Sequence, residues 1–273
     1  MKKWIYYICV ILFAAVFIVS ISYLGYYYWD AQMQQSRYET LSQLRPAANV
    51  RPEPTQSAQQ DQIIPDPLET VEIVDPKTGE KRQVLAEFAE LYRINNDIIG
   101  WLSIPAIDVD YPVMHTPEDP EYYLKRNFDK KKHTAGCLFA AGACDPQEPS
   151  DNIIIYGHRM KNGTMFGNLD KFKKASFCKE NPYIYFDTLE ELHTYEILYV
   201  FLTTASVGEG FAYHQFINTE NQEDFDAFIN QCQKLSVYNA NLEAKFGDKL
   251  ITLSTCDYSS ADGRLVLVAK QIA

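Results

Sequence analysis

A cysteine and an arginine near the C-terminus lie where one β-hairpin would bring them together. Residues 250–255 read Leu-Ile-Thr-Leu-Ser-Thr, a stretch typical of a strand, and lead directly to Cys256. A polar turn at 257–263 separates this strand from a second apolar stretch that starts at Arg264. If the strands pair, the guanidinium faces the thiol. There it would favour the nucleophilic thiolate and bind a substrate carbonyl, or the oxyanion formed on attack.

A histidine stands at the end of another apolar stretch, far away along the chain. Residues 152–156 predict a strand, after which Gly157 allows a tight backbone path and His158 begins the following loop. A loop histidine at a strand end is well placed for proton transfer, because imidazole titrates near neutral pH. The backbone N–H of Asp257, next to the cysteine, is a candidate second oxyanion donor.

Each of these signals has an ordinary structural explanation. A cysteine that ends a strand is more often a small buried side chain than a nucleophile, and a loop histidine is usually solvated. The hypothesis that Cys256, His158 and Arg264 form one site therefore depends on a fold that brings three strand ends together.

The elements that would position these residues are mostly strands. Eight short stretches have the composition of strands, and the apolar residues of 107–114 alternate as in a half-buried strand. The predicted strands are residues 100–104, 107–114, 136–140, 152–156, 183–187, 194–204, 249–256 and 264–272. Helical spacing of apolar residues predicts helices at 84–95, 165–172 and 223–235. This pattern predicts one mainly β domain, a barrel or sandwich of about 190 residues.

The first 29 residues differ in composition from the rest of the chain. Lys2 and Lys3 precede an uncharged stretch at 4–29, which is longer than the roughly 20 apolar residues that cross a bilayer. We expect residues 1–29 to be a single-pass anchor, with the N-terminus in the cytoplasm and the remainder outside the cell. A cleaved signal peptide is the alternative.

The segment between the anchor and the domain has the composition of a linker. Residues 30–45 could continue the helix out of the membrane, and 46–67 carry five prolines among polar residues. A turn signal follows at 75–80. We expect an extracellular stalk over residues 30–83 and a folded domain over 84–273.

Charge and cysteine content exclude several classes of function. The formal net charge of -11 argues against nucleic acid as a partner. Five of the six cysteines lie outside the anchor, an odd number, and no Cys-x-x-Cys pair suggests zinc. We predict neither a metal nor a cofactor. Cys137 and Cys144 are close enough in sequence to form a disulfide, but we do not expect one.

The motifs around these residues resemble those of the sortases of Gram-positive bacteria. The resemblance is carried by Tyr-Gly-His at 156–158, by Thr-Leu-Ser-Thr-Cys at 252–256, and by Arg264 in the next strand. Class B in particular is suggested by the segments 96–105, 110–114, 153–160 and 163–167, and by the insert holding the predicted helix 223–235. The resemblance covers residues 84–272.

The resemblance implies a fold, a reaction and its partners. The fold would be a closed eight-stranded sortase-type β-barrel with an N-terminal helix and a helix inserted between strands 6 and 7. Cys256 would attack a sorting motif near the C-terminus of a secreted protein and form a thioester, and His158 would protonate the departing amine. An amine of a peptidoglycan precursor of the lipid II type would resolve the thioester, while Arg264 positions the substrate and stabilises the oxyanion.

The resemblance also suggests weaker site candidates and one departure. Thr255, Ser254 and the neighbourhood of Asn152 could line the substrate groove, although Thr255 and Ser254 could equally be ordinary strand residues. The carboxylate of Asp257 would disfavour a neighbouring thiolate unless Arg264 offsets its charge.

Three other interpretations remain open from the sequence. A papain-like peptidase acting on wall peptides would use Cys137 with His158, but a helix should then follow the cysteine. An L,D-transpeptidase would need a Ser-His-Gly-Cys run, which the sequence lacks. A non-catalytic anchored binding module would have no need of a cysteine, a histidine and an arginine at three strand ends.

Overall fold

The computed structural model describes residues 3–45, 69–76, 78–145, 150–206, 208–259 and 262–273. Contacts divide the chain into two units, Met1–Pro46 and Ala47–Ala273. The proline-rich linker predicted at 46–67 lies outside the described residues, as does part of the polar turn predicted at 257–263.

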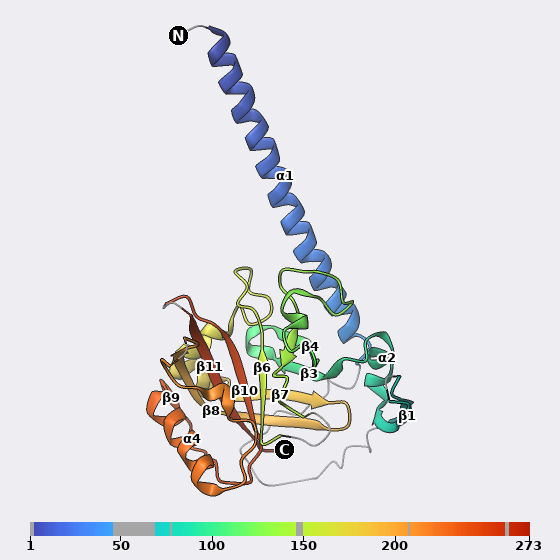
Figure 1. Ribbon diagram of the computed structural model, residues 1–273, viewed down its shortest axis with the longest axis vertical. Helices are drawn as coiled ribbons and strands as arrows, with labels where there is room; N and C mark the ends of the chain where they lie inside the picture. The colour runs from blue at the N-terminus through green and yellow to red at the C-terminus, as the bar shows by residue number, and fades with distance from the viewer. Residues whose placement is uncertain (1–2, 46–68, 77, 146–149, 207, 260–261) are drawn as a thin grey trace. The chain divides into compact units, whose positions relative to one another are not determined.

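The first unit is one long helix, α1 (Lys3–Ser42) (Figure 1). Its most apolar window of 18 residues has a mean hydropathy of 2.6, and that window is not buried inside the protein. At 40 residues the helix is about 60 Å long, roughly twice the thickness of a bilayer core. It therefore continues well beyond residue 29, as the sequence suggested for residues 30–45.

The second unit is built on a closed β-barrel of eight strands. Neighbouring strands pair in the order β11-β10-β6-β5-β4-β3-β7-β8, and β11 pairs in turn with β8, which closes the barrel. β4 with β5 and β6 with β10 are parallel pairs, whereas the other pairs are antiparallel. The bounds are β3 (Ile98–Ile104), β4 (Val109–Met114), β5 (Leu138–Ala140), β6 (Asn152–Tyr156), β7 (Tyr183–Thr188), β8 (Leu192–Thr204), β10 (Leu250–Cys256) and β11 (Gly263–Gln271). All eight predicted strands are confirmed to within a few residues at their ends.

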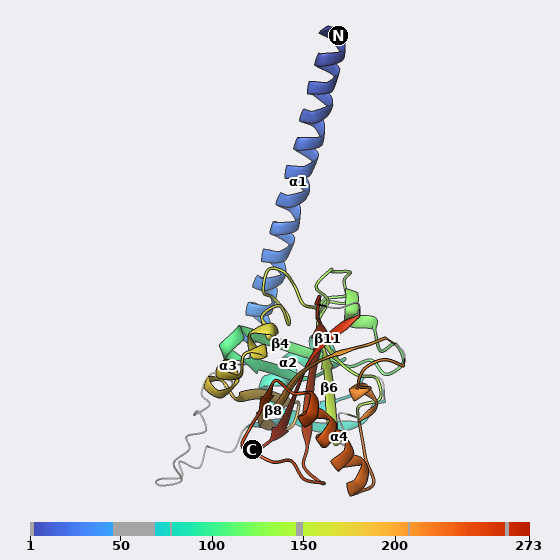
Figure 2. The same ribbon diagram turned by 90° about the vertical axis from the view of Figure 1, so that its left-hand side faces the viewer.

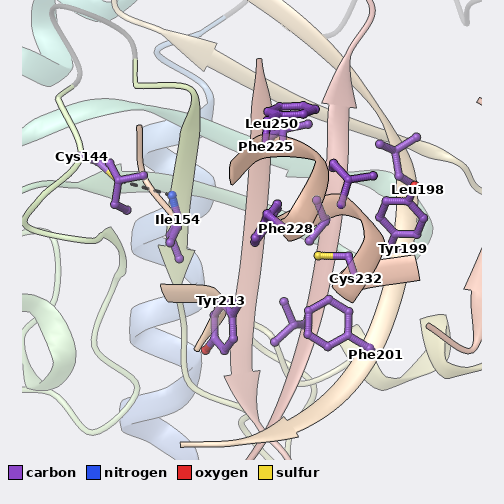
Figure 3. Packing of buried hydrophobic residues seen from close by; sticks show 14 residues of the cluster. Cys144, Ile154, Leu198, Tyr199, Phe201, Tyr213, Phe225, Phe228, Cys232 and Leu250 are labelled. Carbon is purple, nitrogen blue, oxygen red and sulfur yellow. Dashed lines mark hydrogen bonds between the residues drawn. The ribbon is translucent and has the colours of Figure 1, made fainter. Parts of the chain in front are cut away.

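Helix α4 (Gln222–Leu235) lies between β8 and β10 in the chain, which are the sixth and seventh strands of the barrel. Asn221 caps it, because the Asn221 side chain accepts the N–H of Asp224 at 2.9 Å. In Figure 3, Phe225, Phe228 and Cys232 of the helix face the strands of the barrel. The hydrophobic core on this side of the sheet therefore holds the inserted helix, as predicted, against β8, β10 and β11.

The other elements are small and lie around the barrel (Figures 1 and 2). They are the strands β1 (Thr70–Val74), β2 (Lys81–Leu85) and β9 (Tyr238–Asn239), the helices α2 (Ala86–Ile94) and α3 (Ala175–Glu180), and the 3-10 turns η2 (Pro105–Ile107), η3 (Tyr122–Lys125), η4 (Leu169–Lys173) and η5 (Tyr213–Gln215). The helix predicted at 84–95 is α2. β1 and β2 form a hairpin around the predicted turn at 75–80, and all of it except Val84 and Leu85 lies in the segment that the sequence assigned to the stalk.

The helix predicted at 165–172 differs from the structure. Met165 has a positive φ of 53° and forms an isolated bridge with Arg159, so the chain there is a turn. The helical turn begins only at Leu169, as η4. Met165, Phe166, Leu169 and Phe172 are all buried, which explains the apolar spacing that suggested one continuous helix.

Candidate active site

The hairpin of β10 and β11 brings Cys256 opposite Arg264. The two strands are antiparallel, and their register pairs Cys256 with Arg264 at the open end of the hairpin. The guanidinium donates to two carbonyls of its own turn, that of Asp262 at 3.2 Å and that of Gly263 at 3.0 Å. The hairpin therefore joins a thiol and a permanent positive charge over a single turn.

The parallel pairing of β6 with β10 brings His158 to the same edge of the barrel. Ser254 pairs with Tyr156, and the N–H of Gly157 donates to the Ser254 carbonyl at 3.2 Å. A Cβ on Gly157 would lie 2.4 Å from the Leu138 side chain, so a larger residue here would have to displace that buried side chain. The chain leaves β6 beside the end of β10, and His158 is the next residue.

One pocket of about 520 Å³ collects these side chains. Its walls include Cys256, His158 and Arg264, with Phe139 and Tyr156 as aromatic lining. The remaining lining residues are Pro120, Glu121, Leu124, Ala141, Gly142, Ala143, Gly157, Ser254 and Thr255. His158, which is distant in the sequence, thus shares a cavity with apolar walls with Cys256 and Arg264.

The imidazole of His158 is oriented by the backbone. Its Nε2 lies 2.8 Å from the carbonyl oxygen of Leu124, which belongs to η3. Because a carbonyl can only accept, Nε2 carries a hydrogen in this contact, and Nδ1 is the ring nitrogen left to exchange a proton with a substrate. The His158 carbonyl in turn accepts the N–H of Phe166 at 3.0 Å. The imidazole ring and the backbone carbonyl of His158 are therefore both held by hydrogen bonds to the main chain.

The two weaker candidates on β10 line the pocket but already have hydrogen-bond partners. The Ser254 hydroxyl lies 2.6 Å from the hydroxyl of Tyr213. The Thr255 hydroxyl donates to the Gly157 carbonyl at 2.7 Å. Both residues are buried. Thr255 therefore shapes the site by tying β10 to the segment that carries the histidine.

Asn152, a weaker candidate for lining the substrate groove, is not among the residues that line this pocket. It begins β6, so four residues, about 13 Å of extended chain, separate it from Tyr156 at the pocket end. Its amide donates to the Phe216 carbonyl at 2.8 Å and accepts the Thr252 hydroxyl at 2.8 Å. Asn152 is a fully buried structural residue.

The backbone N–H of Asp257 is occupied in this structure. It donates to the Gly263 carbonyl at 2.8 Å, which continues the hairpin one residue beyond Cys256. It could serve as an oxyanion donor only if that hydrogen bond opened, so its role as a donor stays a prediction.

The carboxylate of Asp257 faces a cluster of donors outside the pocket lining. It contacts the Lys173 ammonium, lies 3.5 Å from Arg159 Nη1 and accepts the N–H of Ser259 at 3.0 Å. Burial raises the pKa of this carboxyl, but the hydrogen bonds of Lys173 and Ser259 and the charge of Lys173 outweigh burial and hold the pKa at about 2. The charge of Asp257 is thus compensated by Lys173 and Arg159, and not by Arg264.

Sequence reasoning missed Arg159, Lys173 and Leu124. Arg159 follows His158 directly, so its position next to a catalytic candidate was a usable signal. Lys173 belongs to a lysine-rich segment that reads as solvated surface, and Leu124 contributes only a carbonyl. Neither residue could be found without the fold.

The structure also bears on three alternatives: Cys137 as the nucleophile, a disulfide and a metal site. Cys137 is buried, lies outside the pocket that holds His158 and precedes β5 instead of a helix. The structure describes all six cysteines, and among these described residues no disulfide is formed. Within the residues that the structure describes, no group of three or more His, Cys, Asp and Glu side chains could hold a metal ion.

A closed β-barrel with a cysteine, a histidine and an arginine around one pocket at its rim defines a class of cysteine-dependent enzymes. A family model for the sortase domain matches residues 102–272. The chain belongs to the sortase family, and its relatives place it in class B.

Both sequence and structure relatives support this assignment. The sortase B of Listeria monocytogenes is 32% identical over 199 residues, which are 71% of this chain and 78% of that protein. The Staphylococcus aureus sortase B–substrate complex superposes with a TM-score of 0.63 at 29% identity, covering 69% of this chain and 86% of that chain. The sortase B of Bacillus anthracis in complex with AAEK1 has a TM-score of 0.61 at 31% identity, covering 75% and 90%.

Family membership decides between the interpretations left open by the sequence. The chain is a cysteine transpeptidase of the cell wall, and its family implies substrates with a sorting motif and a cell-wall amine. A non-catalytic binding module is therefore excluded, and so are the papain-like and L,D-transpeptidase alternatives.

Proposed function

We propose that Cys256 is the nucleophile that cleaves the sorting motif. Its sulfur attacks the carbonyl carbon of the scissile peptide bond, and the oxygen carries the negative charge of the tetrahedral intermediate. Arg264 stabilises this oxyanion from across the hairpin. The single observation that carries the proposal is the shared pocket of Cys256, His158 and Arg264.

His158 then serves as the general acid. The C–N bond breaks as the imidazolium gives its proton to the departing amine, and a thioester between Cys256 and the sorted protein remains. In the second half-reaction an incoming amine gives a proton to the now neutral imidazole and attacks the thioester carbonyl. The C–S bond breaks, the thiolate is regenerated, and the sorted protein leaves with a new amide bond.

The amine acceptor belongs to a peptidoglycan precursor of the lipid II type. A precursor carried by a lipid stays at the membrane surface, where an enzyme anchored there meets it. A solved sortase B complexed with triglycine shares 29% identity with this chain, which makes the same tripeptide a sensible acceptor probe.

The N-terminal helix anchors the enzyme in the cell membrane, with the N-terminus in the cytoplasm and the barrel outside. Support comes from the apolar stretch of α1 and from Lys2 and Lys3 before it. Residues 1–29 form the anchor, and the chain up to residue 83 spaces the catalytic domain from the lipid.

The reaction is tested with the full-length protein in detergent micelles. Fluorogenic peptides with Asn-Pro-x-Thr, Ser-Pro-x-Thr-Gly or Leu-Pro-x-Thr-Gly motifs are incubated with and without triglycine. We expect one motif to be cleaved, its product to carry triglycine, and mass spectrometry to find an acyl adduct on the Cys256 peptide that hydroxylamine removes.

The matched variants are Cys256→Ala and Cys137→Ala. Cleavage should disappear in the first and persist in the second. Loss of cleavage in Cys137→Ala alone would transfer the nucleophile to Cys137. Cleavage with no acyl adduct in any variant would refute the thioester.

The topology is tested on intact cells that express the chain with a C-terminal tag. Protease added outside should remove the tag, and a tag protected until the cells are lysed would reverse the orientation.

A further inference from the structure

The segments that carry Cys256 and His158 are joined on the side that precedes both residues. The N–H of Gly157 donates to the Ser254 carbonyl at 3.2 Å, and the Thr255 hydroxyl donates to the Gly157 carbonyl at 2.7 Å. These contacts extend the β6–β10 pairing beyond its last regular pair.

A second connection joins the same segments on the side that follows both residues. Arg159 comes directly after His158, and Asp257 comes directly after Cys256. Arg159 Nη1 lies 3.5 Å from Asp257 Oδ2. The residues just before Cys256 and His158 thus contact each other, and so do the residues just after them.

Lys173 strengthens the second connection from a third segment. Its ammonium contacts the same carboxylate oxygen of Asp257 from the last residue of η4. Arg159 is held in turn by Asp170, also in η4, at 2.7 Å. The ring of Tyr258 lies over the Arg159 guanidinium at 5.4 Å. We call Asp257, Arg159 and Lys173 the carboxylate clamp.

Burial explains why the clamp needs its cations. The side chain of Asp257 is 2% exposed, whereas those of Lys173 and Arg159 are 31% and 21% exposed. A buried carboxylate without paired charges is strongly unfavourable. Located next to the nucleophile, it would also oppose the formation of a thiolate.

We propose that Arg159 and Lys173 are positioning residues of the transpeptidation reaction. By binding Asp257 they hold the end of β10 against the segment that carries His158, and they neutralise the carboxylate closest in sequence to the reacting sulfur. The proposal rests on the proposed function of Cys256 and His158, but it assigns work to residues that touch no reacting atom.

The test compares Lys173→Met and Lys173→Arg in the full-length protein. For Lys173→Met we expect kcat for peptide cleavage to fall about 10- to 100-fold, because small misplacements of reacting groups are costly, with KM for the peptide within about twofold. Lys173→Arg should restore most of kcat, since it keeps the charge.

A second readout separates positioning from a loss of fold. The rate of iodoacetamide alkylation at Cys256, followed by mass spectrometry of its peptide, is measured against pH. In Lys173→Met the half-maximal rate should move up by about one pH unit, because the carboxylate loses a compensating cation. The double variant Lys173→Met/Asp257→Asn should return it towards the wild-type value, since no carboxylate then remains.

Asp151→Asn is the matched control. Asp151 is a partly buried carboxylate that pairs with Lys249 at 2.9 Å at the other end of β6 and β10. Its loss should leave both kcat and the alkylation profile unchanged. Wild-type kcat and an unchanged alkylation profile in Lys173→Met would overturn the clamp, and so would equal effects in Asp151→Asn. If Cys256→Ala stayed active, the proposed function itself would fail, which is a different result.

Discussion

The two ends of the β6–β10 strand pair use similar residues in different ways. At the start, Asp151 pairs with Lys249, and the Asn152 amide accepts the Thr252 hydroxyl, so the polar side chains there serve the fold. At the far end, Cys256, His158 and Arg264 line an open pocket whose walls are otherwise largely apolar. Residue type alone does not distinguish the two ends, because both carry acidic, amide or hydroxyl groups. The feature that distinguishes the far end is its cavity.

The direction of the strands explains why the chemistry lies at one end. β6 and β10 are parallel, so the segments that leave them emerge at the same edge of the barrel. Functional residues in sheets with parallel strands commonly follow the carboxyl ends of those strands, where loops are free to vary. His158 and Cys256 both occupy such positions, whereas Asn152 occupies the opposite one.

The contrast between the two ends would fail most clearly if the pocket end were not needed for catalysis. Cys256→Ala should reduce kcat for sorting-peptide cleavage by at least about 10⁴-fold, because the acyl-enzyme can no longer form. Thermal unfolding followed by circular dichroism should show that the barrel remains folded, since a smaller side chain fits the pocket. Residual cleavage above one-hundredth of the wild-type rate would move the nucleophile elsewhere.

His158→Ala and Arg264→Ala should have the next largest effects. Loss of the general acid is expected to lower kcat about 10²- to 10⁴-fold, and loss of the oxyanion partner about 10²- to 10³-fold. A substrate with a good leaving group distinguishes the roles of His158 and Arg264. An activated thioester substrate needs little protonation, so it should rescue acylation by His158→Ala but not by Arg264→Ala. Equal rescue of both variants would contradict the separate assignments.

Much of the fold was accessible from the sequence because its signals are local. Alternating and apolar runs predicted every barrel strand, and the spacing of the apolar residues in α4 predicted its buried face. Two other elements differ from the prediction. Met165 to Phe172 are buried at helical spacing within a turn, and the β1–β2 hairpin is so short and polar that it read as linker.

The site was only partly accessible for a physical reason. The Cys256–Arg264 pairing follows from one turn between two strands, and the sequence contains that information. The Lys173–Asp257 contact spans 84 residues, and no local pattern encodes it. The sequence shows that Asn152 borders a strand, but not that the pocket lies at the other end of that strand.

Two substitutions with smaller expected effects, Asn152→Ala and Thr255→Val, also test the difference between the two ends. Asn152→Ala should lower the free energy of unfolding by about 2 kcal/mol, because the partly buried Phe216 carbonyl and the buried Thr252 hydroxyl lose their partner. Its kcat per folded molecule should stay within about twofold of wild type. Thr255→Val removes a similar buried hydrogen bond at the pocket end.

Thr255→Val should therefore lower both stability and kcat, since its hydroxyl ties β10 to Gly157. Urea unfolding and steady-state kinetics on the same preparations test the pair. A loss of kcat in Asn152→Ala as large as that in Thr255→Val would show that the two ends are not functionally distinct.

The smallest effect concerns the pH dependence of stability. The pKa of Asp257 is lowered from 3.8 to about 2 in the folded protein. A carboxyl with a lowered pKa stabilises the folded state above its unfolded pKa and loses that contribution as pH falls through the folded pKa. The shift corresponds to about 2 kcal/mol, present above about pH 4 and lost between about pH 4 and pH 2.

Urea unfolding of wild type and Asp257→Asn, followed by tryptophan fluorescence between pH 6 and pH 2.5, measures this contribution. The stability difference between the two proteins should shrink as the pH falls, because protonated aspartic acid and asparagine are both neutral. The pKa of Asp151 is also lowered: burial raises it, but the Thr219 N–H and Lys249 outweigh burial, so Asp151→Asn should show the same trend. Only Asp257→Asn should combine that trend with a lower kcat, because only the Asp257 carboxylate binds Arg159 and Lys173 and so holds the end of β10 against the segment of His158. A constant stability difference at every pH would mean that Asp257 contributes through shape and not through charge.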